Sequence, residues 1–431
     1  MIIPEVFLFS LYAMMKVWIL FCFCLWTGGV YANHILVPMD ETQTNHLKAY
    51  GVAYHALKKG YEIQWLLNYR GGSFVLPFDG EGRTECLLKG VSFEVIPPSR
   101  LTAILNEIAV PEVNADAMKL EKAPKIAVYS PKEKKPWDDA VTLALTYAEI
   151  PYDVVYDSEL LDGGLKDYDW LHLHHEDFTG QMGKFYRNYR HMDWYKAEEA
   201  ANLQTANRFG YTKISELKKA VVRTIRDYVD HGGFMFAMCS ATDTYDIALA
   251  AMEVDICDVM FDGDPVDPDA QEKLDYSRTF AFKDFKLELN PNVYEYSDID
   301  VTESRQVNER DDYFLLFEFS AKWDPVPTML CQNHENMIKG FMGQTTAYNR
   351  KLIKSDVLVM GENKAAGEAR YIHGEFGKGT WTFYGGHDPE DYQHFVGDPI
   401  TELDLHKQSA GYRLILNNVL FPAAKKKQHK T

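Results

Sequence analysis

The sequence predicts an α/β fold in which helices cover a mainly parallel sheet. Short apolar runs, typical of buried strands, alternate with amphipathic helical segments along much of the chain. Such alternation is characteristic of βαβ units and a parallel sheet. The 431 residues are 46% hydrophobic, which is enough to bury a large core in two or three domains.

The first strands and helices lie between residues 33 and 110. They are predicted strands at 33–40, 61–67 and 91–96 and predicted helices at 46–59 and 81–89. We predict that residues 33–120 form a small Rossmann-like βαβ lobe, with the polar stretch 111–125 as the linker to the next domain.

A second series of strands and helices begins near residue 125. Its predicted members are strands at 125–130, 152–156, 168–175 and 234–238 and helices at 138–148 and 214–229. They predict a main domain over 121–424 with a Rossmann-like or flavodoxin-like three-layer sandwich. Two insertions interrupt it. One is helical, at 178–211, and forms a candidate lid; the other is β-rich, at 258–355.

The last strands form a predicted hairpin over 369–384, with Gly377-Lys378-Gly379 at its turn. The segment Gly-Gly-His-Asp-Pro-Glu follows directly at 385–390. A final helix over 412–420 is stopped by Pro422.

Charge excludes one class of partner. The formal net charge of −18 makes the body of the chain unsuited to nucleic acid, because phosphate binding needs clustered Lys and Arg. The basic run Lys425-Lys426-Lys427 belongs to a solvated tail at 425–431. We expect a small-molecule or cell-envelope substrate, and the oligomeric state stays open.

The first 32 residues have the features of a secretory signal peptide. A start at Met14 or Met15 gives a basic Lys16, an apolar run over 17–26 and a small-residue cleavage site at Val30-Tyr31-Ala32. This predicts a periplasmic or secreted protein without a stable membrane span after processing. The alternative is a retained membrane anchor that extends back to Val6.

Four cysteines remain after such processing, too few for a disulfide scaffold in a chain of this length. If Cys239 is a free nucleophile, at most one bridge can form among Cys86, Cys257 and Cys331. The sequence does not say which two would pair.

Cys239 is the first candidate for chemistry. The helix at 214–229 is stopped by Gly232-Gly233, the strand 234–238 ends at the cysteine, and a new helix is expected to start near Thr242 or Asp243. The small neighbours of Cys239 resemble a nucleophile elbow, and a helix N-terminus lowers the pKa of a thiol. The alternative is a buried structural cysteine, because free cysteine is among the most buried residue types.

Together, the helix, Gly-Gly, strand, cysteine elbow and the late hairpin before Gly-Gly-His-x-Pro-Glu resemble the class I glutamine amidotransferase-like superfamily, including its trehalose-utilisation-type branch. The resemblance covers roughly 125–422. It implies that Cys239 is the nucleophile, His387 its base, and Glu390 the group that orients the base. Backbone N–H groups near Ser240 would hold the oxyanion.

The sequence departs from that pattern at two places. The elbow is Ala-Met-Cys-Ser-Ala, whereas glycines flank the cysteine in the family. The spacing from His387 to Glu390 is three residues where the family has two, so Asp388 is an alternative orienting group.

The whole chain also resembles exported bacterial proteins commonly labelled asparagine synthetase B. The motifs expected for that activity are absent from the sequence. There is no cysteine directly after an initiator methionine and no Ser-Gly-Gly-x-Asp-Ser loop, and Gly71-Gly72-Ser73 is more typical of a turn.

A histidine-rich segment follows the strand at 168–175. His172 and His174 share one face of that strand, whereas His175 and Glu176 emerge at its carboxyl end beside the elbow. Histidine and carboxylate can bind zinc, but the spacing matches no metal motif. We therefore predict a polar site wall in which His174, His175 and Glu176 bind substrate, with neither metal nor cofactor, and Glu176 is also a candidate acid partner for Cys239.

Two further groups of residues are not assigned to the site: one is predicted to be structural, and the role of the other stays open. Aspartates between 258 and 269 have prolines that break calcium-loop spacing, which favours a solvated acidic loop. Aromatic residues over 186–195 could stack on a sugar or peptide, or they could pack the lid itself.

These features predict an exported, cysteine-dependent hydrolase or acyl transferase that acts on an amide-like bond. The alternative is a non-catalytic binding module that uses the same pocket for a sugar or a cell-envelope fragment.

Overall fold

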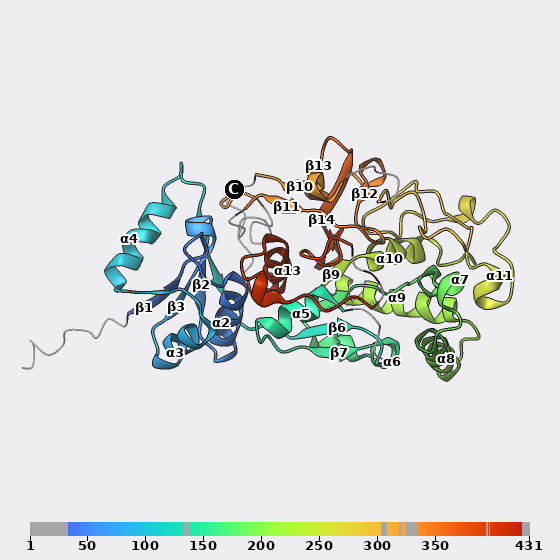
Figure 1. Cartoon of the computed structure of the whole chain (residues 1–431), viewed down its shortest axis with the longest axis horizontal. Coiled ribbons are helices and arrows are strands. Elements are labelled where there is room, and N and C mark those ends of the chain that lie inside the picture. The colour runs from blue at the N-terminus through green and yellow to red at the C-terminus, as the bar shows by residue number, and fades with distance from the viewer. Residues whose placement is uncertain are drawn as a thin grey trace, which may run out of the picture.

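The computed structural model describes residues 33–132, 138–302, 308–318, 320–324, 335–393, 395 and 397–424. The predicted signal peptide, the basic tail and Cys331 lie outside the described residues. Two sheets with helices around them make up the described part, which confirms the α/β class (Figure 1).

The N-terminal lobe contains a five-stranded sheet in the order β4-β1-β3-β2-β5. Its strands are β1 (His34–Val37), β2 (Ile63–Leu67), β3 (Ser73–Pro77), β4 (Glu94–Ile96) and β5 (Asp116–Leu120). Its helices are α2 (His46–Lys58), α3 (Gly80–Lys89) and α4 (Pro98–Ala109). Each strand pairing in this sheet is antiparallel.

The expectation of a parallel sheet in this lobe is therefore wrong. β1 and β2 run in the same direction, since both are antiparallel to β3, but they are not neighbours, and β4 is antiparallel to β1. β3 lies between β1 and β2 and pairs with both, and this strand was missed because it directly follows a glycine-rich turn. At that turn a Cβ on Gly71 would lie 2.2 Å from the carbonyl oxygen of Met39, so the close approach requires glycine. The expected linker at 111–125 contains β5.

The main sheet has ten strands in the order β11-β10-β13-β14-β15-β9-β8-β6-β7, and β12 pairs with β14. Its strands are β6 (Ile126–Tyr129), β7 (Asp153–Val155), β8 (Trp170–Leu173), β9 (Phe234–Met238), β10 (Tyr313–Leu316), β11 (Met337–Lys339), β12 (Tyr348–Asn349), β13 (Leu358–Asn363), β14 (Glu368–Phe376) and β15 (Gly379–Tyr384). The strands from β15 to β7 are parallel, and those from β14 to β11 are antiparallel.

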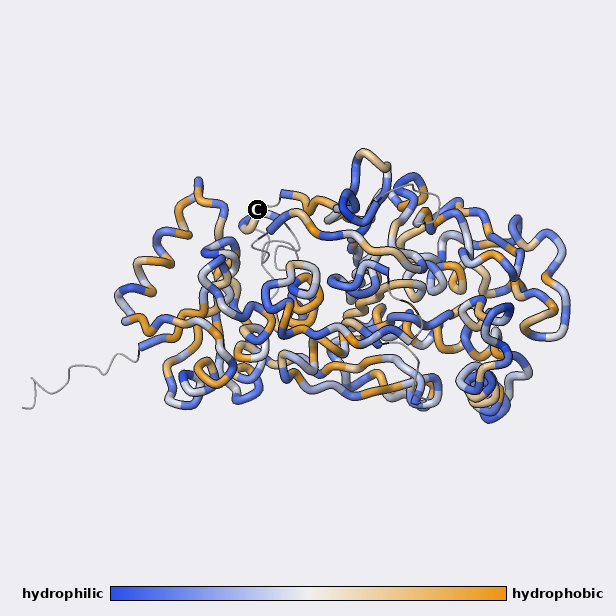
Figure 2. Tube along the Cα trace, in the orientation of Figure 1, coloured by the Kyte–Doolittle hydropathy of each residue, from blue (hydrophilic) through white to orange (hydrophobic). Residues whose placement is uncertain are grey.

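Helices pack against both faces of the parallel strands. They are α5 (Ala140–Tyr147), α6 (Asp157–Leu161), α9 (Ile214–Asp230), α10 (Ser240–Ala250) and α13 (Ala410–Leu420). In β9, Phe234, Phe236 and Met238 join the core under α5 and α13, whereas Met235 and Ala237 join the core under α9 and α10. In Figure 2 hydrophobic residues recur along the backbone of the central part of the molecule, where these helices and strands lie. β9 is thus buried on both faces, as its continuous apolar run requires.

The two predicted insertions differ in regularity. The segment 178–211 is helical, with α7 (Tyr186–Tyr189) and α8 (Asp193–Arg208), as expected. After α11 (Val259–Asp262), the region expected to be β-rich contains isolated bridges rather than strands over 278–301. No helix of the described residues is both long enough and apolar enough to cross a membrane.

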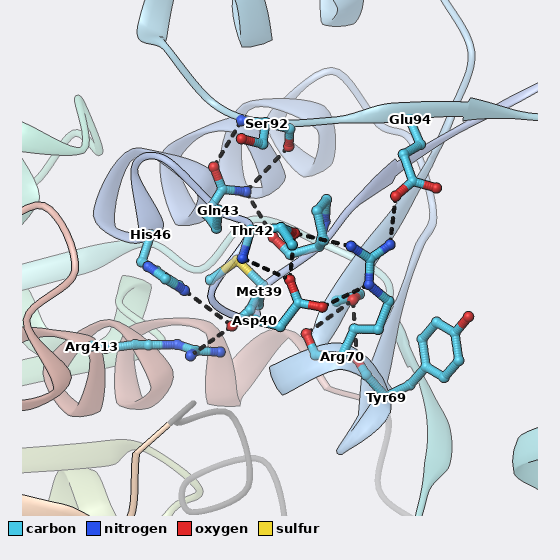
Figure 3. A network of polar contacts seen from close by, with 12 residues as sticks. Met39, Asp40, Thr42, Gln43, His46, Tyr69, Arg70, Ser92, Glu94 and Arg413 are labelled. Atoms are coloured by element: carbon cyan, nitrogen blue, oxygen red, sulfur yellow. Dashed lines mark hydrogen bonds and ion pairs between the residues drawn. The ribbon is translucent and has the colours of Figure 1, made fainter.

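The N-terminal lobe is joined to the main domain through α13. Arg413 is fully buried, and its guanidinium donates to the carbonyl oxygens of Met39 (3.1 Å) and Gly71 and to the hydroxyl of Tyr50 (3.0 Å). Figure 3 shows Arg413 and His46 converging on the carbonyl of Met39. The hydrophobic core under α13 also contains residues of α2, so the lobe and the sheet share one apolar interior.

We expect the substitution Arg413→Met to lower the free energy of unfolding by about 2–4 kcal/mol, because buried carbonyl groups lose a charged donor. The midpoint of urea unfolding would measure this loss. Arg100→Met, at an exposed position on α4, is the control and should leave the midpoint unchanged. Equal midpoints for the two variants would show that Arg413 does not stabilise the junction.

Candidate active site at the carboxyl ends of the parallel strands

Three neighbouring parallel strands deliver the predicted site residues to one edge of the sheet. His174 directly follows β8, Cys239 directly follows β9, and His387 lies three residues beyond the end of β15. Backbone hydrogen bonds tie these ends together. The amide of Cys239 donates to the carbonyl of Gly386 (3.1 Å), and that of Ala241 donates to the carbonyl of His174 (2.9 Å).

Cys239 has the backbone conformation of a sharp elbow. Its φ of 52° and ψ of −145° lie in a region that residues other than glycine rarely occupy. This conformation turns the chain from β9 directly into α10, which starts at Ser240, two residues before the expected start. The strand, turn and helix predicted from the sequence are confirmed. Such strain costs on the order of 1–3 kcal/mol and is concentrated at functional sites.

The thiol of Cys239 is enclosed in this conformation. Its side chain is only 4% exposed, and Sγ donates a hydrogen bond to the carbonyl of Gln344 (3.1 Å). Burial, reinforced by the charges of Asp243 and Asp300, raises the pKa of Cys239 to about 12, although hydrogen bonds from Ser240 oppose the shift. The resting group is therefore a neutral thiol, contrary to the lowered pKa expected at a helix N-terminus.

The loop Gly343–Thr346 forms the cover over this thiol. Thr345 has a φ of 55°, and its amide donates to Asp300 (2.7 Å) while its hydroxyl donates to Asp243 (2.9 Å). The side chain of Gln344 is anchored separately, on the carbonyl of Tyr294 (2.8 Å). No motif in the sequence points to this loop, which lies about a hundred residues beyond the elbow.

Asp139 anchors the histidines beside the elbow. Its Oδ2 contacts His172 Nε2 (3.1 Å) and His174 Nδ1 (2.8 Å), and its Oδ1 accepts from the amide of Thr142 as the N-cap of α5. Burial opposes ionisation of this carboxyl, but the charges and hydrogen bonds of the two histidines prevail and hold the pKa of Asp139 well below its ordinary value. The sequence analysis did not single out this residue, although an acidic residue before an apolar helix is a typical N-cap signal.

His174, His175 and His387 form a compact group of rings. The rings of His174 and His175 are stacked, with centroids 3.7 Å apart, and the ring of His387 lies 5.2 Å and 4.4 Å from them. Desolvation, together with repulsion from the other two histidines, lowers the pKa of His175 well below its ordinary value. His175 is therefore neutral at pH 7.

The predicted acidic residues occupy different positions around this group. Glu176 accepts a hydrogen bond from the hydroxyl of Tyr156 (3.1 Å). Asp388 is buried, which raises its pKa, and its Oδ1 accepts from the amide of Glu390. The carboxylate of Glu390 contacts Lys339 (2.7 Å) and His406 (3.1 Å) and lines a cleft of 430 Å³.

The two remaining candidate groups have structural partners. In the acidic loop, Lys213 pairs with Asp255 (2.7 Å) and Asp264 (2.5 Å). Aromatic rings of the insertion pack on one another, for example Trp194 on Tyr189 (5.5 Å between centroids) and on Tyr195 (5.8 Å). These contacts favour packing within the insertion over ligand stacking.

Comparison with known proteins adds little. No family model and no curated protein matches the chain. Among solved structures it is similar to Cytoplasmic Protein STM3548 from Salmonella typhimurium (10% identity, TM-score 0.33) and STM1381 from Salmonella typhimurium LT2 (12%, 0.35), each over 70% of this chain and 100% of the other. It is also similar to the GH42 β-galactosidase Gan42B (9%, 0.24), over 62% of this chain and 28% of that enzyme.

The enclosure of the Cys239 thiol predicts how fast it reacts with an alkylating reagent. With a pKa of about 12, only about one Cys239 side chain in ten thousand is ionised at pH 8, whereas about a quarter would be in the unfolded chain. Iodoacetamide should therefore label Cys239 slowly in the folded protein, with a rate that still rises above pH 10, and rapidly in urea. Peptide mass spectrometry measures both rates. A labelling rate that levels off near pH 7 would contradict the neutral resting thiol.

Proposed function

We propose that this chain is an exported, amidotransferase-like hydrolase or acyl transferase that acts on an amide-like bond, with Cys239 as nucleophile and His387 as base. The main support for this proposal is the strained backbone conformation of Cys239. A residue with φ of 52°, held at the carboxyl end of a central parallel strand and followed at once by a helix, has the geometry of a nucleophile elbow.

The arrangement of the fold supports the same function. Helices pack on both faces of the strands from β15 to β7, as in a flavodoxin-like three-layer sandwich. Ligands of open parallel sheets bind at the carboxyl ends of the strands, where Cys239 and the histidines lie. The antiparallel strands from β14 to β11 extend this sheet beyond β15.

In the proposed reaction Sγ of Cys239 attacks the carbonyl carbon of the amide while His387 accepts the thiol proton. The tetrahedral intermediate then expels the amine, which takes the proton back from His387 and leaves a thioester. Water, activated by the same imidazole, hydrolyses the thioester, or a second amine captures the acyl group. The backbone amide and side chain of Ser240 hydrogen-bond to Sγ in the resting site, and we propose that this amide donates to the oxyanion when it forms.

Two features of the resting site define what must change on substrate binding. The thiol is neutral, so the proton has to leave during the attack and not before it. The carbonyl of Gln344 accepts the S–H hydrogen bond, so the loop Gly343–Thr346 has to move before an amide can reach Sγ. We therefore expect reactivity toward substrate-like electrophiles that exceeds reactivity toward general thiol reagents.

A binding module for a sugar or cell-envelope fragment is the second candidate. It is favoured by the 4% exposure of Cys239 and by the hydrogen bond that its thiol makes with a backbone carbonyl. Such a protein would use the histidine-rich edge for recognition and would keep Cys239 as a structural residue.

A carboxamide-mimicking diazoketone, 6-diazo-5-oxonorleucine, separates the two functions. The catalytic proposal expects a covalent adduct on Cys239 that forms at neutral pH and at least about 100-fold more slowly in His387→Gln, since removing a general base typically costs this much. Intact-protein and peptide mass spectrometry measure the adduct.

Cys257 is the matched control for this experiment. It is also free and buried, its pKa is also raised, and its Sγ also donates to a backbone carbonyl, that of Thr179 (3.2 Å), but it does not occupy an elbow. The variant Cys257→Ser should keep the adduct, whereas Cys239→Ser should abolish it. Equal labelling of both cysteines, or no adduct in a folded protein that binds the reagent saturably, would favour the binding module.

A further inference from the structure

The three histidines His174, His175 and His387 place ligating nitrogens close together. One ring nitrogen of each lies within 4.8 Å of those of the other two. In a tetrahedral zinc centre, with Zn–N bonds of about 2.0–2.1 Å, the ligand nitrogens are about 3.4 Å apart. Binding of one ion by all three residues would therefore require the rings to turn so that these nitrogens come closer together.

His174 has the hydrogen bonding of a metal ligand. Its Nδ1 is held by the carboxylate of Asp139 at 2.8 Å, which makes Nδ1 the donor and leaves the lone pair on Nε2. That Nε2 is buried, in a side chain 2% exposed, and has no hydrogen-bond partner among the described residues. A buried imidazole nitrogen without a partner is unfavourable unless a ligand occupies the space in front of it. Carboxylate, histidine and metal in this order form a common triad.

His175 is oriented in a matching way. Its Nε2 lies 3.1 Å from the carbonyl oxygen of Asp138, so Nε2 donates and Nδ1 carries the lone pair. Its ring stacks on that of His174 at an interplanar angle of 12°, so one of the two rings has to turn out of the stack when both bind the same ion. Two consecutive residues, Asp138 and Asp139, therefore orient two consecutive histidines from the start of α5.

A second group of possible ligands, Asp139, His172 and His174, is less suited to a metal ion. Its three ligating atoms are already satisfied by one another, because Oδ2 of Asp139 contacts both imidazoles. An ion there would have to break these hydrogen bonds, whereas an ion bound to Nε2 of His174 together with His175 and His387 would leave them intact. The role that fits Asp139 is to orient a ligand and not to bind the ion.

We propose that His174, His175 and His387 bind a divalent transition-metal ion, of which Zn²⁺ is the best match to three imidazole ligands. Three protein ligands leave one coordination position for water or for a carbonyl or hydroxyl oxygen of a small molecule, as in catalytic zinc sites. This site goes beyond the proposed function, and it does not require that Cys239 be a nucleophile. The sequence contains no histidine motif that predicts this metal site, because His387 is more than two hundred residues away from His174 and His175.

Binding of Zn²⁺ and Co²⁺ to the full chain tests the proposal. We expect one equivalent of Zn²⁺ to bind, measured by competition with a chromogenic chelator after dialysis against EDTA. Co²⁺ should give the intense visible bands of a four- or five-coordinate ion rather than the weak bands of the hexa-aqua ion. His174→Gln and His387→Gln should each weaken Zn²⁺ binding at least about 100-fold. Asp139→Asn should weaken it about 10–100-fold, as expected for an outer-shell partner.

His172→Gln is the control that separates the two groups of ligands, because His172 shares Asp139 with His174 but lies outside the proposed site. It should keep the stoichiometry and affinity of the unmodified chain. Circular dichroism of each variant checks folding, and the Co²⁺ spectrum of the unmodified chain tests the site without any substitution.

Any of three results would overturn the proposal. The first is a lack of stoichiometric Zn²⁺ binding, and the second is a Co²⁺ spectrum like that of the hexa-aqua ion. The third is loss of Zn²⁺ binding in His172→Gln together with its retention in His387→Gln. The thiol adduct on Cys239 is a separate measurement, so failure of the metal site and failure of the cysteine reaction can be told apart.

Discussion

The carboxylate of Asp139 is the constraint on which the site depends. One oxygen caps α5 through the amide of Thr142, and the other holds His172 and His174. A single side chain therefore couples the position of a helix to the orientation of two rings on the neighbouring strand. Because both histidines favour its charged form, the group stays ionised in spite of its burial. Loss of this charge would release the helix end and the rings together.

The same coupling extends to the elbow through the backbone. The carbonyl of His174 accepts from the amide of Ala241 in the first turn of α10, and the amide of Cys239 donates to the carbonyl of Gly386. The strained conformation of Cys239 thus persists because hydrogen bonds to two neighbouring strand ends determine it. An elbow held from both sides presents its side chain in one direction, which is what nucleophilic attack and structural anchoring both require.

Much of this edge could be predicted from the sequence, because the signals are local. Gly232-Gly233 stops α9, an apolar run of five residues specifies a strand buried on both faces, and the hairpin turn at 377–379 positions β15 and therefore His387. The N-terminal lobe was predicted less well. Its strands alternate with helices as parallel strands do, but β3 is inserted between β1 and β2, and β4 and β5 pair antiparallel with β1 and β2 at the two edges. The loop Gly343–Thr346, which covers the thiol, has no local signal in the sequence. Only tertiary packing brings the carbonyl of Gln344 to Sγ of Cys239.

His387 lies against the rings of His174 and His175, and the residue before it, Gly386, accepts a hydrogen bond from the amide of Cys239. The proposed base and a proposed metal ligand are therefore the same residue. An imidazole that accepts a thiol proton needs its lone pair free at the moment of attack, whereas a metal ligand donates that lone pair to the ion. The two uses exclude each other at one time. With the thiol neutral and covered at rest, the resting protein favours the arrangement in which His387 belongs with His174 and His175. Movement of the cover would then be the event that makes the thiol a competitor for His387.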